Sequence, residues 1–328
     1  MRKTFILALL ALVLCGARAV AQSSLMATLS HDGQISTFYG ASALQQAHEA
    51  ADHGDVITLS SGSFAGVDIT KAVTIRGAGM EVDTVHAIDP TVITEDFNID
   101  IADSVTNILT MEGVYHNQEI EIGNLKNAMF LKCRFYRFGK GTTAEQSSLK
   151  DLNFVNCRIA SRYSDGSGGS ASFINSIVYG IFGQYGNYSF INSILFGEDY
   201  VNDSEFKNCI LVEVGSNSSC SYYNNLFINN FTGGGISDIP NTTNVHLNMG
   251  DARIANLLGD YSDSNPYMLT EEAKNILKGT DGTEVGIYGG NIPYDATPTN
   301  PRITKFEVSP KTTAEGKLSV DIEVNGGE

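Results

Sequence analysis

Positively charged side chains gather in one segment of an otherwise acidic chain. Between residues 126 and 162 only Glu145 and Asp151 are acidic, whereas eight residues are basic: Lys126, Lys132, Arg134, Arg137, Lys140, Lys150, Arg158 and Arg162. Clustered guanidinium and ammonium groups bind carboxylates through charge-assisted hydrogen bonds. A lyase that cleaves uronic-acid polymers by elimination needs such cations, together with a Lys, Arg or His base that takes the C5 proton.

This segment therefore predicts a groove for an acidic polysaccharide. The residues that we expect to bind the substrate are Lys132, Arg134, Arg137, Arg158 and Arg162. Nothing in the sequence singles out one of them as the catalytic base, so the catalytic residues stay unassigned. The alternative is a screened surface pair, or a pair of arginines neutralised by acidic residues of a loop such as Glu145 or Asp151.

The elements that position these cations come from a short repeat. The phrases are FLKCRF from 130, FVNCRI from 154, FINSIV from 173, FINSIL from 190, FKNCIL from 206 and YYNNLF from 222. Short β-branched and aromatic units broken by Gly, Asn and Ser indicate strands and turns, and a period of 16–24 residues is typical of a β-solenoid. Stacked coils would bury the apolar face that no single coil can bury alone.

Each place in the repeat has an expected role. The aromatic first place should form one buried column. The third place, mostly asparagine, should form a bend in the left-handed backbone conformation. The fourth place accepts Cys, Ser or Asn, so Cys133, Cys157 and Cys209 are expected to be small buried thiols without disulfides. The fifth place should point outward, which would put Arg134 and Arg158 side by side in solvent on adjacent coils.

The stretch before the repeats specifies the start of the coil. Ser42 and Gln45 predict a capping box for a short helix over 42–53, followed by a strand at 56–59 and another at 73–75. This helix, HGDVITLSSGSF and KAVTIRGAG resemble the opening of the pectin-lyase-like superfamily, and DGTEVGIYGG at 281–290 resembles the last-coil phrase of secreted β-helix proteins. The resemblance implies an all-β, single-stranded, right-handed parallel β-helix with an N-terminal capping helix. It does not imply an activity, because that superfamily holds lyases, hydrolases and adhesins.

The two ends of the chain are expected to lie outside this coil. Arg2 and Lys3, the apolar run 5–14 and Ala19-Val20-Ala21 predict a signal peptide over 1–21, hence export to the periplasm, cell surface or extracellular space. The β-helix is expected over 22–297. At 298–328, alternating apolar residues after Pro298 and Pro301 predict a short hairpin that packs on the last coil or adds a strand to a partner protein.

Composition and missing motifs exclude several classes of function. Cleavage of the signal leaves 18 basic against 37 acidic residues, a net charge of −19 that disfavours nucleic acids and anionic membranes. No later stretch is apolar enough to be transmembrane, and the sequence shows no P-loop, H-E-x-x-H or spaced metal ligands, so no cofactor or metal is predicted. The motifs of polygalacturonases and calcium-dependent pectate lyases are also missing.

Three interpretations follow from these observations. The first is an exported, non-catalytic, carbohydrate-associated surface protein, which the missing motifs favour. The second is a polysaccharide lyase that acts on an acidic glycan, which the basic segment favours. The third is a structural or adhesive surface module whose hairpin docks a partner.

Overall fold

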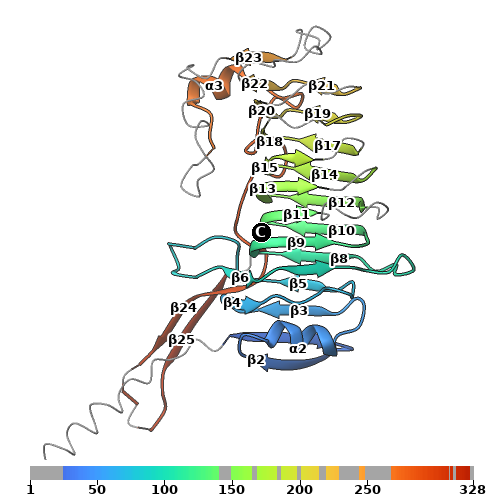
Figure 1. Ribbon diagram of the computed structural model, residues 1–328. Coiled ribbons are helices and arrows are strands. Elements are labelled where there is room, and N and C mark those ends of the chain that lie inside the picture. The colour runs from blue at the N-terminus through green and yellow to red at the C-terminus, as the bar shows by residue number, and fades with distance from the viewer. Residues whose placement is uncertain are drawn as a thin grey trace, which may run out of the picture.

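The computed structural model shows a parallel β-helix of about eight coils (Figure 1). It describes residues 25–139, 149–164, 168–182, 186–197, 201–213, 219–228, 244–247, 267–309, 311–312 and 315–325, without the side chains of 162, 182 and 302–306. The predicted signal peptide lies outside these residues. No helix within the described part of the chain is both long and apolar enough to cross a membrane.

Two long sheets, here named sheet A and sheet B, form the walls of the coil. The order in sheet A is β2 (Gln34–Tyr39), β1 (Met26–His31), β3 (Val56–Leu59), β5 (Thr74–Arg76), β8 (Leu109–Glu112), β10 (Leu125–Leu131), β12 (Leu149–Val155), β14 (Ser170–Ile174), β17 (Asn187–Ile191), β19 (Glu205–Lys207) and β21 (Ser221–Tyr223). All its pairs are parallel except those of β1 with β2 and with β3.

Sheet B carries the second strand of each coil. Its order is β4 (Gly62–Ala65), β6 (Thr91–Thr94), β9 (Val114–Ile122), β11 (Arg134–Gly139), β13 (Arg158–Ser164), β15 (Ile177–Tyr179), β18 (Ile194–Phe196), β20 (Ile210–Val212), β22 (Leu226–Ile228) and β23 (Val245–Leu247). Strand β7 (Phe97–Ile99) also pairs with β9, and β16 (Ile181–Phe182) pairs with β13.

The first place of the repeat forms the predicted buried column. Phe130, Phe154, Phe173, Phe190, Phe206 and Tyr222 pair rung on rung, with ring centroids 4.8–5.0 Å apart. The spacing equals the distance between neighbouring strands of a sheet, so the rings stack as a consequence of the register. The predicted register is confirmed.

The third place forms the sharp bend from sheet A to sheet B. Its residues all have φ between 47° and 57°: Lys132, Asn156, Asn175, Asn192, Asn208 and Asn224. Asparagine tolerates this left-handed conformation better than other residues with a side chain, which explains its recurrence. Neighbouring bends also hydrogen-bond to each other: Asn208 Nδ2 donates to Asn192 Oδ1 at 3.1 Å.

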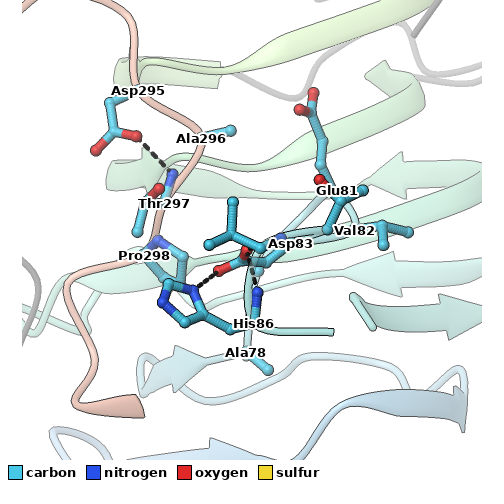
Figure 2. A pocket seen from close by; sticks show the side chains of 12 residues that line it. Ala78, Glu81, Val82, Asp83, His86, Asp295, Ala296, Thr297 and Pro298 are labelled. Carbon is cyan, nitrogen blue, oxygen red and sulfur yellow. Dashed lines mark hydrogen bonds and ion pairs between the residues drawn. The ribbon is translucent and has the colours of Figure 1, made fainter. Parts of the chain in front are cut away.

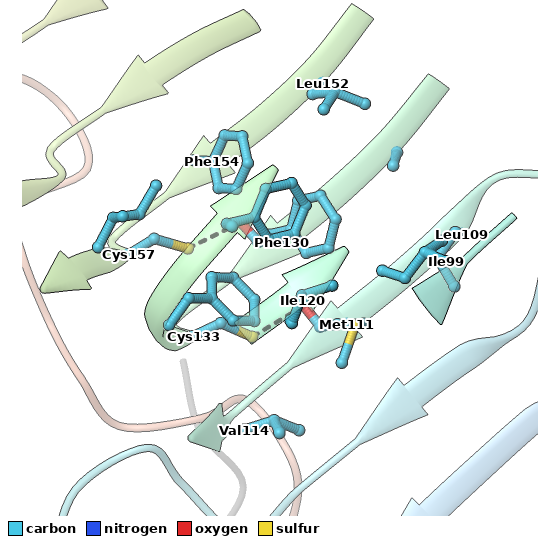
Figure 3. Packing of buried hydrophobic residues seen from close by; sticks show 14 of the residues in the cluster. Ile99, Leu109, Met111, Val114, Ile120, Phe130, Cys133, Leu152, Phe154 and Cys157 are labelled. Carbon is cyan, nitrogen blue, oxygen red and sulfur yellow. Dashed lines mark hydrogen bonds between the residues drawn. The ribbon is translucent and has the colours of Figure 1, made fainter. Parts of the chain in front are cut away.

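The fourth place explains why Cys, Ser and Asn can replace one another. Each of these side chains donates to the carbonyl of the aromatic residue one coil earlier: Cys157 to Phe130, Ser176 to Phe154, Ser193 to Phe173, Cys209 to Phe190 and Asn225 to Phe206. Figure 3 shows Cys157 in this position and Cys133 one coil earlier, where the thiol donates to the Met111 carbonyl. The fourth-place cysteines Cys133, Cys157 and Cys209 form no disulfides, as predicted, and burial raises the pKa of Cys157 and of Cys209 to about 12.

Helix α2 (Ala43–Ala50) closes the first coil, and its apolar residues Ala43, Leu44 and Ala47 are buried against it. The predicted capping box is wrong. Ser42 is the N-cap residue, but its backbone (φ −88°, ψ 10°) lies outside the extended region, and its hydroxyl accepts from the Gln46 side chain instead of a backbone N–H. The helix C-terminus is held by Lys71, whose Nζ donates to the carbonyls of His48, Glu49 and Ala51.

After the coils, the chain turns back along the outer face of sheet B (Figure 1). We name residues 267–300 the strap. Near its start lies helix α3 (Glu271–Ile276), whose N-cap Thr270 accepts from the Ala273 N–H. The strap covers a second apolar cluster made by fifth-place residues Ile177, Ile194, Ile210 and Leu226, together with its own Tyr267, Leu269, Leu277, Val285 and Ile287. Thus DGTEVGIYGG, expected to form the last coil, lies outside the coils.

The hairpin follows the strap. Strands β24 (Arg302–Val308) and β25 (Val320–Asn325) form the predicted antiparallel pair as a sheet of their own. The prediction that they pack on the last coil is wrong: the strap has by then returned to the early coils, where the Asn300 side chain donates to the Gly77 carbonyl. The hairpin therefore projects beside β4 and β6 (Figure 1).

Candidate functional site

Four of the five predicted cations lie on adjacent strands of sheet B, as expected, and Lys132 lies at the bend before β11, but their environments differ. Arg134 and Arg158 are direct partners of β11 and β13, and Arg137 and Arg162 pair next to them. The Arg162 side chain lies outside the described residues, as does Glu145. The fifth place does point away from the coil interior. Whether each arginine can reach a ligand therefore depends on which other residues lie over it.

Arg158 does not face solvent, contrary to the prediction. Its exposed fraction is 4%, because the strap lies over it. The Glu81 carboxylate lies 3.1 Å from its Nη1, its Nε donates to the Tyr294 hydroxyl at 2.6 Å, and the guanidinium lies over the Tyr294 ring. Glu81, which belongs to a loop of an earlier coil, thus supplies a neutralising charge, whereas Glu145 lies outside the described residues.

Lys132 also contacts the strap. Its Nζ donates to Asp295 Oδ2 at 3.0 Å and to the Thr297 carbonyl. Burial alone would raise the pKa of Asp295, but the hydrogen bonds from Thr297 and Lys132 outweigh it and lower that pKa. Lys132 is therefore engaged in an internal ion pair, which removes it from the set of cations that a glycan could contact without moving the strap.

Arg134 and Arg137 stay closer to the surface. The Arg134 guanidinium lies 4.3 Å from the Tyr115 ring centroid, a cation–π contact. Arg137 is 45% exposed and lies 3.6 Å from the Glu119 carboxylate. The structure brings the predicted residues onto one face but does not leave them together as an open cationic groove.

Successive third-place residues along the coil axis form hydrogen bonds with successive parts of the strap. Asn224 donates to the Lys278 carbonyl, Asn208 accepts from the Thr280 N–H, and Asn175 donates to the carbonyls of Ile287 and Gly289. Further down, Glu112 accepts from the Thr299 N–H. The strap therefore runs opposite to the coils and is bound by the bends of several of them.

Glycines of the strap permit this close approach. A Cβ at Gly290 would lie 2.3 Å from Asn192 Nδ2, and the residue has φ +77°. A Cβ at Gly279 would lie 2.7 Å from the Asn208 side chain. Gly290 of the GIYGG phrase, and Gly279 before it, thus let the strap pack closely on the asparagine bends.

A pocket of about 360 Å³ opens where the strap passes the loop that follows β5 (Figure 2). The loop contributes Ala78, Gly79 and residues 81–86, and the strap contributes Asp295, Ala296, Thr297 and Pro298. This lining joins residues more than two hundred positions apart in the sequence. We take it as the candidate binding site because it lies beside the predicted cations and is open to solvent.

The acidic groups of this pocket are each matched by a positive or titratable partner. Glu81 pairs with Arg158, and Asp295 pairs with Lys132. Asp83 accepts from the backbone N–H groups of Val85 and His86 and lies 2.8 Å from His86 Nδ1; the His86 hydrogen bond lowers the pKa of Asp83 to about 2. The lining is polar, with paired charges rather than an excess of either sign.

The side chains that line this pocket can form hydrogen bonds with a ligand. A carboxylate has about four lone-pair sites, so a paired carboxylate can still accept from a ligand hydroxyl. If His86 Nδ1 carries a proton that is donated to Asp83, Nε2 of the neutral ring is an acceptor. Within the described residues, no group of three or more His, Cys, Asp or Glu residues could hold a metal ion.

Sequence reasoning missed the residues of this pocket. His86 was visible as a histidine without metal-ligand spacing, and Asp83 three residues before it is a spacing that a loop can close into a hydrogen bond. No local signal joins Asp295 to that loop. Comparisons with protein-family models, with curated proteins and with solved structures found no match, so the site is interpreted from its own geometry.

Proposed function

We propose that this protein is an exported, non-catalytic β-helix that binds a neutral polysaccharide at the pocket between the 78–86 loop and the strap. The observation that carries the proposal is the charge balance of that pocket: Glu81, Asp83 and Asp295 each have a partner. Sugar hydroxyls are donors and acceptors, and they suit a lining of paired carboxylates and an imidazole.

An acidic glycan fits this pocket less well. Binding a uronate requires cations that are free to approach its carboxylate. Lys132 and Arg158 already compensate Asp295 and Glu81, and separating either pair would leave a partly buried carboxylate without its partner. The lyase interpretation therefore depends on Arg134, Arg137 and Arg162 alone. It is the alternative that the experiment below can support.

Affinity electrophoresis through gels with neutral or uronic-acid polysaccharides tests the proposal on the mature chain, residues 22–328. We expect a neutral polysaccharide to retard the protein, with little dependence on salt because no net charge is neutralised. Asp83→Asn and His86→Ala should each weaken the retardation, while Asp68→Asn, in another pocket, should not. Retardation only by uronic-acid polymers, or new ultraviolet absorbance from an unsaturated product, would contradict it in favour of the lyase.

Export is the second part of the proposal, and the residues of the predicted signal peptide support it. Cell fractionation of a bacterium that expresses the full chain tests this part. The mature protein should begin at Gln22 and leave the cytoplasm, whereas a cytoplasmic protein with an intact N-terminus would contradict export.

A further inference from the structure

Strand β2 forms the open edge of sheet A, at the end of the coil that helix α2 closes (Figure 1). Among the described residues β2 pairs only with β1, in an antiparallel ladder. An edge strand presents backbone N–H and C=O groups that can pair with another chain, and proteins usually protect such edges with charged residues or proline. The sequence of β2, QISTFY, contains neither, so nothing in the strand itself opposes the addition of a further strand.

The backbone groups that point to the open edge belong to alternate residues of β2. The Gly40 N–H, one residue past the strand, donates to the Leu25 carbonyl at 2.8 Å. Hydrogen-bonded pairs alternate along an antiparallel ladder, so the even-numbered residues of β2 exchange their hydrogen bonds with β1. The N–H and C=O groups on the open side are therefore those of Ile35, Thr37 and Tyr39.

The side chains of the same three residues lie on the outer face of sheet A. Ala27 and Leu29 of β1 are buried, and their partners in β2 are even-numbered residues. Since directly opposed side chains share a face, the odd-numbered residues of β2 point outward. Ile35 is 75% exposed and Tyr39 is 61% exposed. Large apolar side chains beside an open strand edge are the features of an association surface.

We propose that β2 pairs with β2 of a second copy of this chain, antiparallel and centred on Thr37. A two-fold axis perpendicular to the sheet keeps the outer faces of both copies on the same side. In this register Ile35 of each copy lies opposite Tyr39 of the other, and the two Thr37 residues lie opposite each other. Aromatic–β-branched and Thr–Thr pairs are among the favourable cross-strand pairs. Registers centred on Ser36 or Phe38 would leave Tyr39 or Ile35, respectively, without a strand residue opposite it.

Charge explains why two copies would meet at β2. The chain has a net charge of −16, so two copies repel each other except where the contacting surface is uncharged. The exposed strand β25, by contrast, would place Asp321 opposite Glu323 if it paired with its own copy about Ile322, and opposed like charges are destabilising. In the β2 pair, the exposed Asp32 of the β1–β2 turn would lie near the start of helix α2 of the other copy. That helix has no acidic residue in its first turn and no side-chain cap.

This inference goes beyond the proposed polysaccharide site and does not depend on it. Sedimentation velocity of the mature chain, residues 22–328, tests it. A strand of six residues buries less than the roughly 800 Å² per partner of a typical stable interface, so we expect a reversible dimer with a Kd on the order of micromolar. The sedimentation coefficient should therefore rise from that of a monomer to that of a dimer between about 1 and about 100 μM protein.

One variant and a matched control locate the contact. Thr37→Lys puts two ammonium groups opposite each other at the two-fold axis and should raise the Kd about tenfold or more. Ser30→Lys is the control: it adds the same charge on the same outer face, but on β1, opposite Ile35 and one strand away from the contact. The control should keep the Kd within about twofold of the wild-type value.

A mixing experiment tests the register itself. Ile35→Glu and Tyr39→Lys should each weaken self-association, because each homodimer then has two charged groups opposite apolar ones. In a mixed dimer, the carboxylate introduced in one copy faces the ammonium introduced in the other, while the second Ile35–Tyr39 pair stays intact. An equimolar mixture should therefore dimerise at concentrations where neither variant does so alone.

Three results would overturn the proposal: a wild-type protein that stays monomeric or forms only larger species, a Thr37→Lys variant that dimerises like the wild type, or a mixture that associates no better than its two components. Thermal melts of all variants show whether the fold is kept, and Thr37→Glu replaces Thr37→Lys if that variant melts early. A dimer without retardation by neutral polysaccharides would contradict only the proposed function.

Discussion

Sheet B carries apolar residues on its inner face and, at Ile177, Ile194, Ile210 and Leu226, on its outer face, yet the two faces are covered in different ways. The inner face packs on the phenylalanine column, and its neighbours in space come from the adjacent coils, such as Cys157 with Phe130 at a separation of 27 residues. The outer face is covered by the strap, as in the contact of Arg158 with Tyr294 at a separation of 136 residues. The residues that cover the inner face recur with the sequence repeat. The residues that cover the outer face all come from one late segment, the strap.

This difference explains why two arginines in the same repeat place can have different environments. Arg134 and Arg158 are register partners in the fifth place, with the same residue type and the same outward direction. Arg158 is buried by Tyr294 and neutralised by Glu81, while Arg134 lies over Tyr115. The cover, not the repeat, decides whether a fifth-place arginine is a surface group.

The phenylalanine column, which covers the inner face of sheet B, should give the largest loss on truncation. Phe190→Ala removes a fully buried ring that stacks on Phe173 and Phe206, and should destabilise the protein by about 3–5 kcal/mol. Chemical denaturation followed by circular dichroism measures this loss. Tyr223→Ala, at an exposed position of the same sheet, serves as the control and should cost much less. Equal losses in the two variants would show that the column is not a core.

Substitutions at the bends that bind the strap should cause the next largest loss of stability. Asn175→Ala leaves the carbonyls of Ile287 and Gly289 without their donor and puts alanine at φ 47°, which should cost about 2–3 kcal/mol. Denaturation midpoints measure this cost. Asn175→Gly separates the two causes, since glycine accepts the backbone conformation but cannot donate. A glycine variant as stable as the wild type would mean that the strap contacts contribute nothing.

The arginine pair gives a direct test of unequal cover. Arg158→Ala should cost about 1–3 kcal/mol, because Glu81 loses its partner within the covered region, whereas Arg134→Ala should cost less than about 1 kcal/mol. Both values come from the same denaturation experiment. Similar losses in the two variants would refute the distinction between the covered and uncovered fifth places.

The capping helix adds a smaller, pH-dependent effect. Burial lowers the pKa of His48 to about 4 from its ordinary 6.5, so between these values the unfolded chain binds a proton that the folded protein does not. The stabilising contribution of the neutral ring is therefore complete above about pH 6.5 and is lost progressively as the pH falls toward 4.

Comparison of the wild type with His48→Gln isolates this contribution from the titration of carboxylates. The Thr70 N–H, which donates to His48 Nε2, can donate to the side-chain oxygen of glutamine instead. The difference in unfolding free energy between the two proteins should shift against the wild type between pH 6.5 and 4. A difference that does not change with pH would show that His48 titrates normally.

The sequence was sufficient for those parts of the molecule whose neighbours repeat along the chain. The coil, the phenylalanine column, the asparagine bends and the free thiols of Cys133 and Cys157 follow from spacing and residue type, because each coil packs on a near copy of itself. The capping helix and the hairpin also follow from local patterns. The capping box was wrong because the Ser42 backbone lies outside the extended region that such a cap needs.

The candidate site was not predictable to the same degree. The segment around 126–162 was chosen for its charge, but charge along the chain does not reveal which acids lie across from it. Glu81 and Asp295 meet Arg158 and Lys132 only because the strap and the 78–86 loop fold over the same coils. The glycines of residues 281–290 were a signal for that packing, and they were assigned to a last coil because their partner surface was unknown.

Hydrogen exchange of the strap tests most directly the claim that the outer face of sheet B is closed. The Gly286 N–H donates to the Asn208 carbonyl and the Tyr294 N–H donates to the Ile287 carbonyl, so peptides over 279–294 should exchange nearly as slowly as those of β18 and β20. Mass spectrometry of the mature protein at neutral pH reports this directly. Exchange of 279–294 at the rate of an unprotected peptide would contradict the account, because Arg158 and its apolar neighbours would then lie uncovered.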